Sequence, residues 1–321
     1  MNEPSFPFAR LMPKADARAI RHGAPWVYAN DVVLDRRTKA LAPGSIAILQ
    51  DAERQNMAIV AVNPKSKIPV RVLDRDLDAK IDKAWIALRL RKALAHRARL
   101  FDAQYYRLVH AEADGFPGVI IDRFGDIAVL QPNAAWADQL VDQIADALVA
   151  EVGIGTIILN GSILDVNLAG LEDRMDVLRG DAPKEPVPVP MNGATYFADL
   201  MGGQKTGLFY DQRPNHAFAA SLAKDARVLD VFSHVGGFAL AALAGGASSA
   251  LAVDGSAPAL ALAQKGAVAG GVDAAFTTKK SDAFAALTDL AEAGETFDLV
   301  ICDPPAFAPS KNALQTGLRA Y

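Results

Sequence analysis

The chain has 321 residues, of which 51% are hydrophobic and 22% are charged, and its formal net charge is −4. This composition is ordinary for a globular protein and excludes a chain disordered along its length, while the length favours two or three domains. The single cysteine, Cys302, excludes an internal disulfide framework and a zinc site built from several thiolates, and we predict no metal site. Because neither a run of eighteen apolar residues nor a signal-peptide pattern occurs, we predict a cytoplasmic protein that does not enter a membrane.

Charge is distributed unevenly along the chain. Residues 1–110 hold 20 Lys and Arg against 11 Asp and Glu, whereas residues 111–321 hold 13 against 26. Lysines and arginines that neutralise phosphates release counterions and provide affinity for nucleic acids of any sequence. The first third therefore favours contact with RNA, with a mixed solvated surface as the alternative.

The first region of the chain, residues 11–76, holds short strand candidates separated by turn residues. That spacing suits a small β-barrel, so we place a first domain at residues 1–77. The predicted strands are Pro25–Tyr28, Ser45–Leu49, Met57–Val62 and Pro69–Leu73.

The second region opens with a helical pattern from residue 79 to about residue 101. Four apolar residues at helical spacing are expected to form its buried face. They are Ala87, Leu90, Leu94 and Ala98.

A basic stripe is expected on nearly the opposite face of this helix. Arg89, Lys92 and Arg99 belong to it and are our candidate RNA-binding residues; a solvated helix face is an equally weighted alternative. Alternating strand and helix patterns follow, so we place a central α+β domain at residues 78–185.

Four prolines in residues 181–190 exclude a helix or a central strand there and indicate a linker. Beyond the linker the pattern becomes strand, glycine loop, helix, strand, helix, strand. That order is typical of a doubly wound parallel sheet, and we place a third domain at residues 186–321.

A glycine-containing loop follows the first strand of this third domain. Phe232, Ser233, Gly236 and Gly237 belong to it, and the two glycines allow a ligand to approach the backbone at a helix N-terminus. The loop lacks the GxGxxG spacing that holds a pyrophosphate, so a dinucleotide is disfavoured. A purely structural turn is the alternative.

Acidic residues follow the next strands. Asp254 ends the second strand, where it can accept hydrogen bonds from ribose hydroxyls, although Asp254 or Ser256 could equally cap the following helix. Asp282 stands beside Phe284 and is a candidate for an adenine amino group. Asp303 and Pro304 begin an Asp-Pro-Pro motif directly after the fourth strand, where ligands sit in open α/β sheets.

These motifs together resemble class I S-adenosylmethionine-dependent methyltransferases, specifically the large-subunit ribosomal RNA methyltransferase I group that makes 5-methylcytosine. Residues 203–213, Gly-Gln-Lys-Thr-Gly-Leu-Phe-Tyr-Asp-Gln-Arg, are similar to a signature at the entrance of that group's methyltransferase domain. Residues 11–14, 23–30 and 64–73 look like its PUA domain, an RNA-binding barrel. The resemblance covers the whole chain. It implies an α/β fold in which a Rossmann-like class I methyltransferase domain follows a PUA β-barrel and a central α+β domain.

The resemblance also implies the cofactor S-adenosyl-L-methionine, a cytosine of 23S ribosomal RNA as the substrate, and a homodimer as one candidate assembly. By resemblance, Phe232 to Gly237 wrap the cofactor, Asp254 holds its ribose and Asp282 meets its adenine. Asp303 and Pro304 complete this site, with Asp303 as the candidate catalytic residue. Four further residues are implied near the methionine end of the cofactor: Lys205, Thr206, Asp211 and Arg213.

Methylation at carbon 5 of cytosine implies attack of a thiolate on carbon 6 before the methyl transfer. Cys302 lies inside an apolar strand directly before Asp303, so we expect a buried and unreactive structural thiol. The family's nucleophile follows the next strand, in a Ser-Cys-Ser type motif that this sequence lacks. We therefore expect that the chain is truncated at its C-terminus and that the nucleophile lies beyond residue 321.

Two alternative functions stay open. An N7-guanine or amino-group RNA methyltransferase needs no cysteine, and an Asp-Pro-Pro motif followed by an aromatic residue also resembles the acidic motif of enzymes that methylate exocyclic amines. A noncatalytic RNA-binding protein with a vestigial cofactor fold is the other alternative. Cofactor binding separates both enzymes from this last one.

Overall fold

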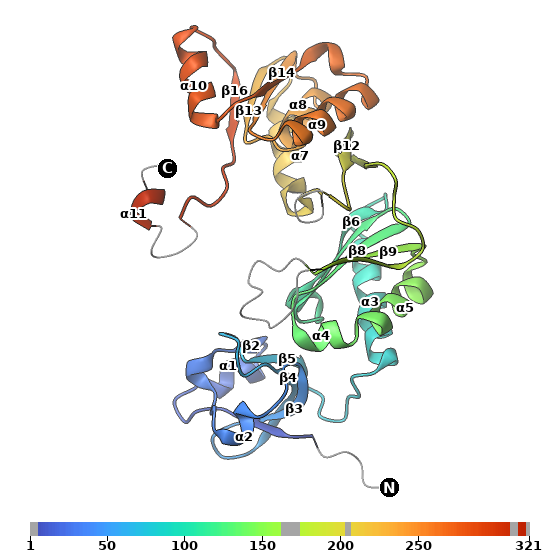
Figure 1. Cartoon of the computed structure of the whole chain (residues 1–321), viewed down its shortest axis with the longest axis vertical. Coiled ribbons are helices and arrows are strands. Elements are labelled where there is room, and N and C mark those ends of the chain that lie inside the picture. The colour runs from blue at the N-terminus through green and yellow to red at the C-terminus, as the bar shows by residue number, and fades with distance from the viewer. Residues whose placement is uncertain (1–5, 162–173, 203–206, 309–313, 319–321) are drawn as a thin grey trace. The chain divides into compact units, whose positions relative to one another are not determined.

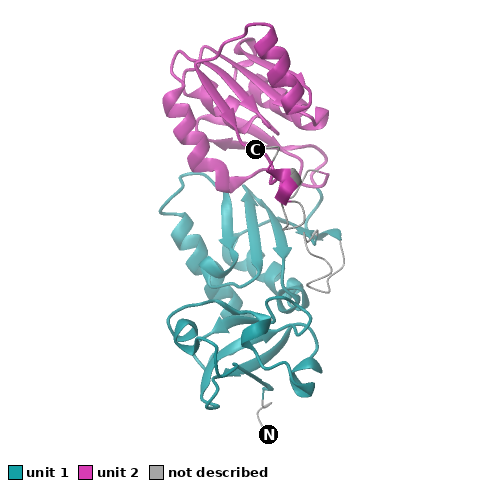
Figure 2. Cartoon of the chain, turned by 90° about the vertical axis from the view of Figure 1, so that its left-hand side faces the viewer, with its two compact units in different colours: residues 1–182 teal, residues 183–321 magenta. Residues whose placement is uncertain are grey.

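A computed structural model describes residues 6–161, 174–202, 207–308 and 314–318. The chain divides into two compact units, residues 1–182 and 183–321 (Figure 2). The predicted division of the first unit at residue 77 stays a prediction. Among the described residues, no helix is both long and apolar enough to cross a membrane.

The first sheet of unit 1 has five strands in the order β1-β3-β4-β5-β2. All four strands predicted for this region are present, and only β1 pairs in parallel, with β3. The sequence did not predict β1, because three residues carry too little periodicity. The strands are β1 (Phe8–Arg10), β2 (Trp26–Val27), β3 (Ser45–Gln50), β4 (Asn56–Val62) and β5 (Val70–Asp74).

Three short helical segments connect the strands of this sheet: α1 (Ala17–Arg21), η1 (Ala29–Asp31) and α2 (Arg36–Lys39). The side chains of Asp16 and Asp35 cap α1 and α2 by accepting backbone N–H groups of their first turns. A bridge between Leu11 and Val32 adds a link outside the named strands.

The second sheet of unit 1 also has five strands, in the order β10-β9-β8-β7-β6, and helices pack against it (Figure 1). Trp85, Phe116 and Trp136 form the aromatic centre of this core, with ring centroids 5.7–6.0 Å apart. The strands are β6 (Tyr105–His110), β7 (Val119–Phe124), β8 (Ile127–Pro132), β9 (Thr156–Asn160) and β10 (Met175–Arg179). The helical segments are α3 (Lys83–Arg97), η2 (Ala111–Asp114), α4 (Ala135–Gln139) and α5 (Val141–Val152).

The buried face predicted for α3 is confirmed at Leu90 and in part at Leu94, which packs against the core, but it is wrong at Ala98. Trp85, Ile86, Leu90 and Ala93 are buried, whereas Ala98 is exposed. Because residues three and four apart share a helix face, Arg89 lies next to Trp85, Ile86 and Ala93 rather than opposite the core. The large Trp85 side chain determines which face packs inward.

Unit 2 contains a parallel sheet with the strand order β15-β14-β13-β16. The chain passes from β13 to β14 and β15 on one side and returns to β16 on the other, so a switch of direction lies at β13. The strands are β13 (Arg227–Val231), β14 (Ser249–Asp254), β15 (Phe276–Lys280) and β16 (Leu299–Cys302). The helical segments are η3 (Tyr210–Gln212), α7 (Arg213–Leu222), α8 (Gly237–Ala244), α9 (Ala257–Ala269), η4 (Asp273–Ala275), α10 (Ala283–Glu292) and α11 (Leu314–Gly317).

The proline-rich stretch before this sheet is only partly a linker. Residues of its second half form β11 (Val187–Met191), which pairs antiparallel with β12 (Ala194–Ala198). Pro188 and Pro190 alternate with apolar residues, so both prolines lie on one face of a two-stranded hairpin and leave the other face for packing. The linker prediction is therefore wrong from Val187 onward.

Candidate functional site

Acidic residues gather at the carboxyl edge of the parallel sheet in unit 2. Val231 pairs with Val253 of β14 and with Cys302 of β16. Asp254 and Asp303 each come one residue later, so the two carboxylates follow the strands on either side of β13 at the same level. This edge, at the switch around β13, is where open α/β sheets bind their ligands.

The loop between β13 and α8 has a strained backbone. Phe232 and His234 adopt positive φ angles of 64° and 51°, and Gly236 adopts 78°. A left-handed conformation costs a residue other than glycine about 1–3 kcal/mol, and such residues concentrate at functional sites. The His234 ring packs edge-on against Phe209 with centroids 5.3 Å apart, and burial lowers its pKa.

Asp254 fixes this loop. Its Oδ2 accepts the backbone N–H of His234 at 2.8 Å, and its Oδ1 accepts the backbone N–H of Ser256 at 2.8 Å. The cap of α9 is Ser256, whose Oγ accepts the N–H of Ala259, so the alternative that Asp254 is the cap is excluded. Each oxygen of Asp254 keeps acceptor capacity for a ligand hydroxyl.

Glycine is required at positions 236 and 237 of the loop for two different structural reasons. Gly236 needs its positive φ, and a β-carbon there would lie 3.0 Å from the side chain of Ala263. A β-carbon on Gly237 would lie 2.7 Å from Nε2 of the buried His216 on α7. Close packing between α7 and α8 thus requires Gly237, whatever ligand the loop holds.

The sequence pattern did not single out Asp230, which lies in β13 directly before this loop. Its side chain is fully enclosed, Oδ2 accepts the N–H of Ala239 at 3.0 Å, and burial raises its pKa to about 7. Within the described residues, its Oδ1 has no hydrogen-bond partner, nor do Ser233 Oγ and His216 Nδ1. Buried polar atoms normally have partners, so these three orphaned atoms around one loop fit a site that receives a polar ligand or ordered water.

Asp282 has a structural role at the start of α10. Its Oδ1 caps α10 by accepting the N–H groups of Phe284 and Ala285 at 3.0 and 3.1 Å. The Phe284 ring is half exposed and lies 5.9 Å from Phe307, which in turn lies 6.0 Å from Phe232. These rings form an aromatic surface suited to a flat heterocycle such as adenine.

Asp303 is held by the segment that precedes α7. Gln212 donates from Nε2 to Asp303 Oδ2 at 2.8 Å, and Asn215 donates from Nδ2 to Gln212 Oε1 at 2.7 Å. The contact joins the Asp-Pro-Pro motif, with Pro304 half-buried, to the signature around residue 211. No local sequence pattern indicates the roles of Gln212 and Asn215.

Two of the other four residues implied by the resemblance, Asp211 and Arg213, lie within the described part of the chain. Asp211 is exposed and Arg213 is half-buried, with the backbone carbonyl of Arg213 accepting from Asn192 Nδ2 at 2.8 Å. Lys205 and Thr206 lie outside the described residues.

The expectation that Cys302 is buried is wrong. Its side chain is exposed, as is Val300 two residues earlier, because β16 is an edge strand among the described residues and its outer face lacks a full cover. The pKa of Cys302 is raised by partial burial and by Asp303 and Asp230 nearby. A thiolate nucleophile needs the opposite surroundings, namely neighbouring cations.

The candidate RNA-binding residues lie in unit 1 and differ from one another. Arg89 is mostly buried and engaged: it donates to Asp74 Oδ2 at 2.7 Å and to the Gly115 carbonyl at 2.9 Å. Lys92 and Arg99 are exposed. The prediction of a uniform basic stripe is therefore wrong, because Arg89 is part of the packing of its own unit.

Comparisons with known proteins agree with this architecture. Residues 9–75 match the family model of a PUA-like domain, and residues 172–320 match that of an S-adenosylmethionine-dependent methyltransferase. The chain is 37% identical over 316 residues to "Ribosomal RNA large subunit methyltransferase I" of Alteromonas mediterranea, covering 97% of this chain and 78% of that protein. It is 35% identical to "Ribosomal RNA large subunit methyltransferase" of Deinococcus radiodurans, covering 99% and 80%.

Among solved structures, a putative methyltransferase from Streptococcus mutans superposes with a TM-score of 0.79 at 20% identity, covering 98% of this chain and 82% of that one. This likeness shows the fold. The predicted fold class, an α/β methyltransferase domain preceded by a PUA-like domain, is confirmed.

Proposed function

Because the chain belongs to the ribosomal RNA large subunit methyltransferase I family, we propose that it methylates carbon 5 of a cytosine in 23S ribosomal RNA. The family's cofactor, S-adenosylmethionine, supplies an electrophilic methyl group. The observation that carries the proposal is the pair of carboxylates, Asp254 and Asp303, at one edge of the sheet beside a strained loop with orphaned polar atoms.

We assign cofactor binding to the loop and the acids around it. Asp254 accepts hydrogen bonds from ribose hydroxyls, Ser233 Oγ gains a polar partner, and the surface of Phe284 and Phe307 receives the adenine. Asp282, which caps α10, orients that aromatic surface and meets the adenine amino group with its remaining acceptor capacity. Lys205, Thr206, Asp211 and Arg213 stay proposed for the methionine end.

We assign Asp303 to the target base. A carboxylate directly after β16 can accept a hydrogen bond from the exocyclic amine of cytosine, and Gln212 holds one of its oxygens in place. Cys302 is not assigned as the nucleophile, because its neighbours disfavour the thiolate.

RNA binding is assigned to unit 1, whose first 110 residues carry the excess of basic side chains. A homodimer and a cytoplasmic location complete the proposal. Light scattering of the purified protein tests the dimer.

The experiment uses protein that includes the thiol nucleophile, which Cys302 does not provide, and measures transfer of labelled methyl groups to unmodified large-subunit RNA by nuclease digestion and mass spectrometry of the nucleosides. We expect 5-methylcytidine. Methylated guanosine or N4-methylcytidine would establish the alternative amino-group or N7 chemistry. Binding of both RNA and cofactor without any methylated nucleoside would contradict the enzyme assignment.

A further inference from the structure

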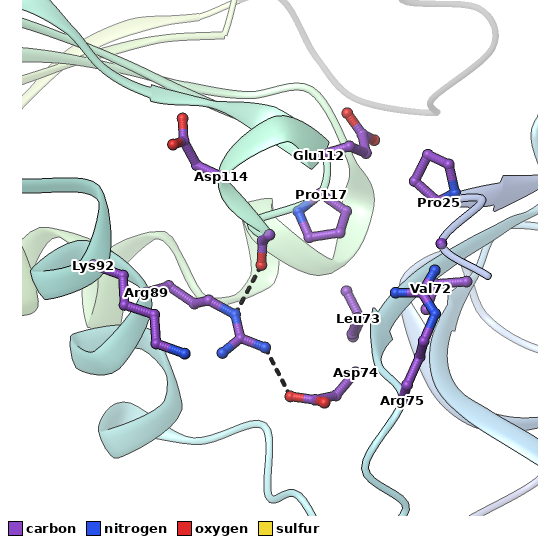
Figure 3. A pocket seen from close by; sticks show the side chains of 12 residues that line it. Pro25, Val72, Leu73, Asp74, Arg75, Arg89, Lys92, Glu112, Asp114 and Pro117 are labelled. Atoms are coloured by element: carbon purple, nitrogen blue, oxygen red, sulfur yellow. Dashed lines mark hydrogen bonds and ion pairs between the residues drawn. The ribbon is translucent and has the colours of Figure 1, made fainter. Parts of the chain in front are cut away.

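A pocket of about 360 Å³ lies within unit 1 (Figure 3). The loop between α1 and β2, the end of β5, α3 and the turn after η2 all contribute to it. Pro25 and Pro117 provide apolar surface, and Lys92 and Arg75 lie on opposite sides of Asp74. We call it the junction pocket; its volume is in the range of small-molecule binding sites.

Asp74 in this pocket is already neutralised. Arg89 donates to its Oδ2 at 2.7 Å, and Trp85 donates to the same oxygen from Nε1 at 2.8 Å. The Arg89 guanidinium also stacks over the Trp85 ring, 4.3 Å from its centroid. Asp74 and Arg89 are therefore a fixed part of the wall, and neither is a mobile partner for a ligand.

The other two carboxylates of the pocket wall, Glu112 and Asp114, form ion pairs with arginines. Arg71 forms an ion pair with Glu112. Arg97 bonds both oxygens of Asp114, at 2.8 and 2.6 Å. Neither Arg71 nor Arg97 lines the pocket. Each of the two carboxylates is therefore neutralised by an arginine that lies outside the pocket.

Arg75 and Lys92 are the remaining cationic residues that line the pocket. Arg75 donates from Nε to the Ile20 carbonyl and from Nη2 to the Ala24 carbonyl, both at 3.0 Å, so its charge is held in place by neutral groups. Lys92 is exposed, and no ion pair to it is found among the described residues. With every wall carboxylate matched, the net field of the pocket favours an anion.

We propose that the junction pocket binds one nucleotide of a single-stranded RNA segment, with Lys92 and Arg75 on the two phosphates that flank it. The proposal deepens the proposed function and rests on its RNA substrate. Two cations on opposite sides match a nucleotide inside a strand, which has a phosphate at each end, better than a free nucleoside monophosphate. Pro25 and Pro117 also line the pocket, and their apolar faces can pack against a base.

The test measures binding of a fluorescent single-stranded RNA of about eight nucleotides to the full chain, over a series of salt concentrations. Lys92→Gln should weaken binding about fivefold near 0.1 M salt and lower the salt slope by about 0.7, the value for one phosphate contact to a single strand. Arg75→Gln should act similarly. Lys83→Gln is the matched control, since Lys83 lies on the same helix, is 73% exposed and does not line the pocket.

The outcomes separate this proposal from the proposed function. RNA binding that is unchanged in Lys92→Gln, or weakened equally in Lys83→Gln, overturns the junction pocket while the RNA substrate stands. A wild-type protein that binds cofactor but no RNA contradicts the RNA substrate itself. Two competitors test the identity of the ligand. If cytidine monophosphate competes as strongly as unlabelled RNA at equal phosphate concentration, the ligand is a free nucleotide and not a strand. If polyglutamate competes as strongly as RNA, with its carboxylate concentration equal to the phosphate concentration of the RNA, the ligand is an acidic peptide.

Discussion

Gln212 and Asp303 are 91 residues apart in sequence, yet the Gln212 side-chain amide donates to the Asp303 carboxylate at 2.8 Å. Asn215 bonds the amide oxygen of Gln212 and so orients its nitrogen toward Asp303. This chain of hydrogen bonds makes Gln212 a positioning residue, acting on the proposed base contact through Asp303.

Gln212→Ala should lower kcat/KM for RNA about tenfold, because a hydrogen bond to a charged group contributes about 1.5–3 kcal/mol. The dissociation constant for S-adenosylmethionine should change little. Asn215→Ala should have a smaller effect in the same direction. Ser221→Ala is the control, since that hydroxyl lies on α7, the helix that follows Gln212, and donates to the Phe218 carbonyl. Equal kcat/KM values for wild type and Gln212→Ala would refute the positioning role.

Asp254→Ala should weaken S-adenosylmethionine binding by about 2–4 kcal/mol, through loss of the ribose acceptor and of the bond that fixes the His234 backbone. Isothermal calorimetry measures the change. Asp273→Ala, at an exposed position of η4, serves as the charge-matched control. Wild-type affinity in Asp254→Ala would remove Asp254 from the cofactor site.

The raised pKa of Asp230 predicts that the free energy of unfolding depends on pH. Its pKa is about 7 in the folded chain against an ordinary value of 3.8, so between these values the unfolded chain loses a proton that the folded chain keeps. The free energy of unfolding should therefore fall as pH rises from about 4 to 7, by on the order of 4 kcal/mol from this group. Above pH 7 the contribution is constant.

Urea unfolding of wild type and Asp230→Asn across this range measures the effect as a difference between the two proteins. The comparison is needed because His216, with its pKa lowered to about 4 by burial, opposes Asp230: it destabilises the fold as pH falls from 6.5 to about 4. Parallel curves for the two proteins would show that Asp230 titrates normally.

Cys302 should react with iodoacetamide in the folded protein, since its side chain is exposed. The reaction at pH 7 should be slower than that of free cysteine and should accelerate with pH, because the raised pKa disfavours the thiolate. Mass spectrometry of the alkylated peptide gives the rate. Labelling faster than free cysteine would reveal an activated thiol and reopen its role as a nucleophile.

Local sequence pattern determined the four parallel strands of unit 2 and the acids at their ends. Short apolar strands stopped by turn-forming residues placed Asp254 and Asp303 after β14 and β16, because strand period and chain termination are local properties. The family motifs identified the cofactor class for the same reason. The signature at residues 203–213 is contiguous, so it is a local property of the sequence.

Tertiary structure decided which side chains are buried, paired or exposed. The contact between Gln212 and Asp303 and the orphaned oxygen of Asp230 arise from segments distant in sequence, so no local period encodes them. Cys302 looked buried because its strand is apolar, but burial depends on what packs over an edge strand. Likewise, the helical spacing of Arg89 predicts a surface position. Only the packing of α3 near the end of β5 shows that Arg89 forms an ion pair with Asp74. Spacing along the chain determines which residues share a face, whereas packing against other segments decides what that face meets.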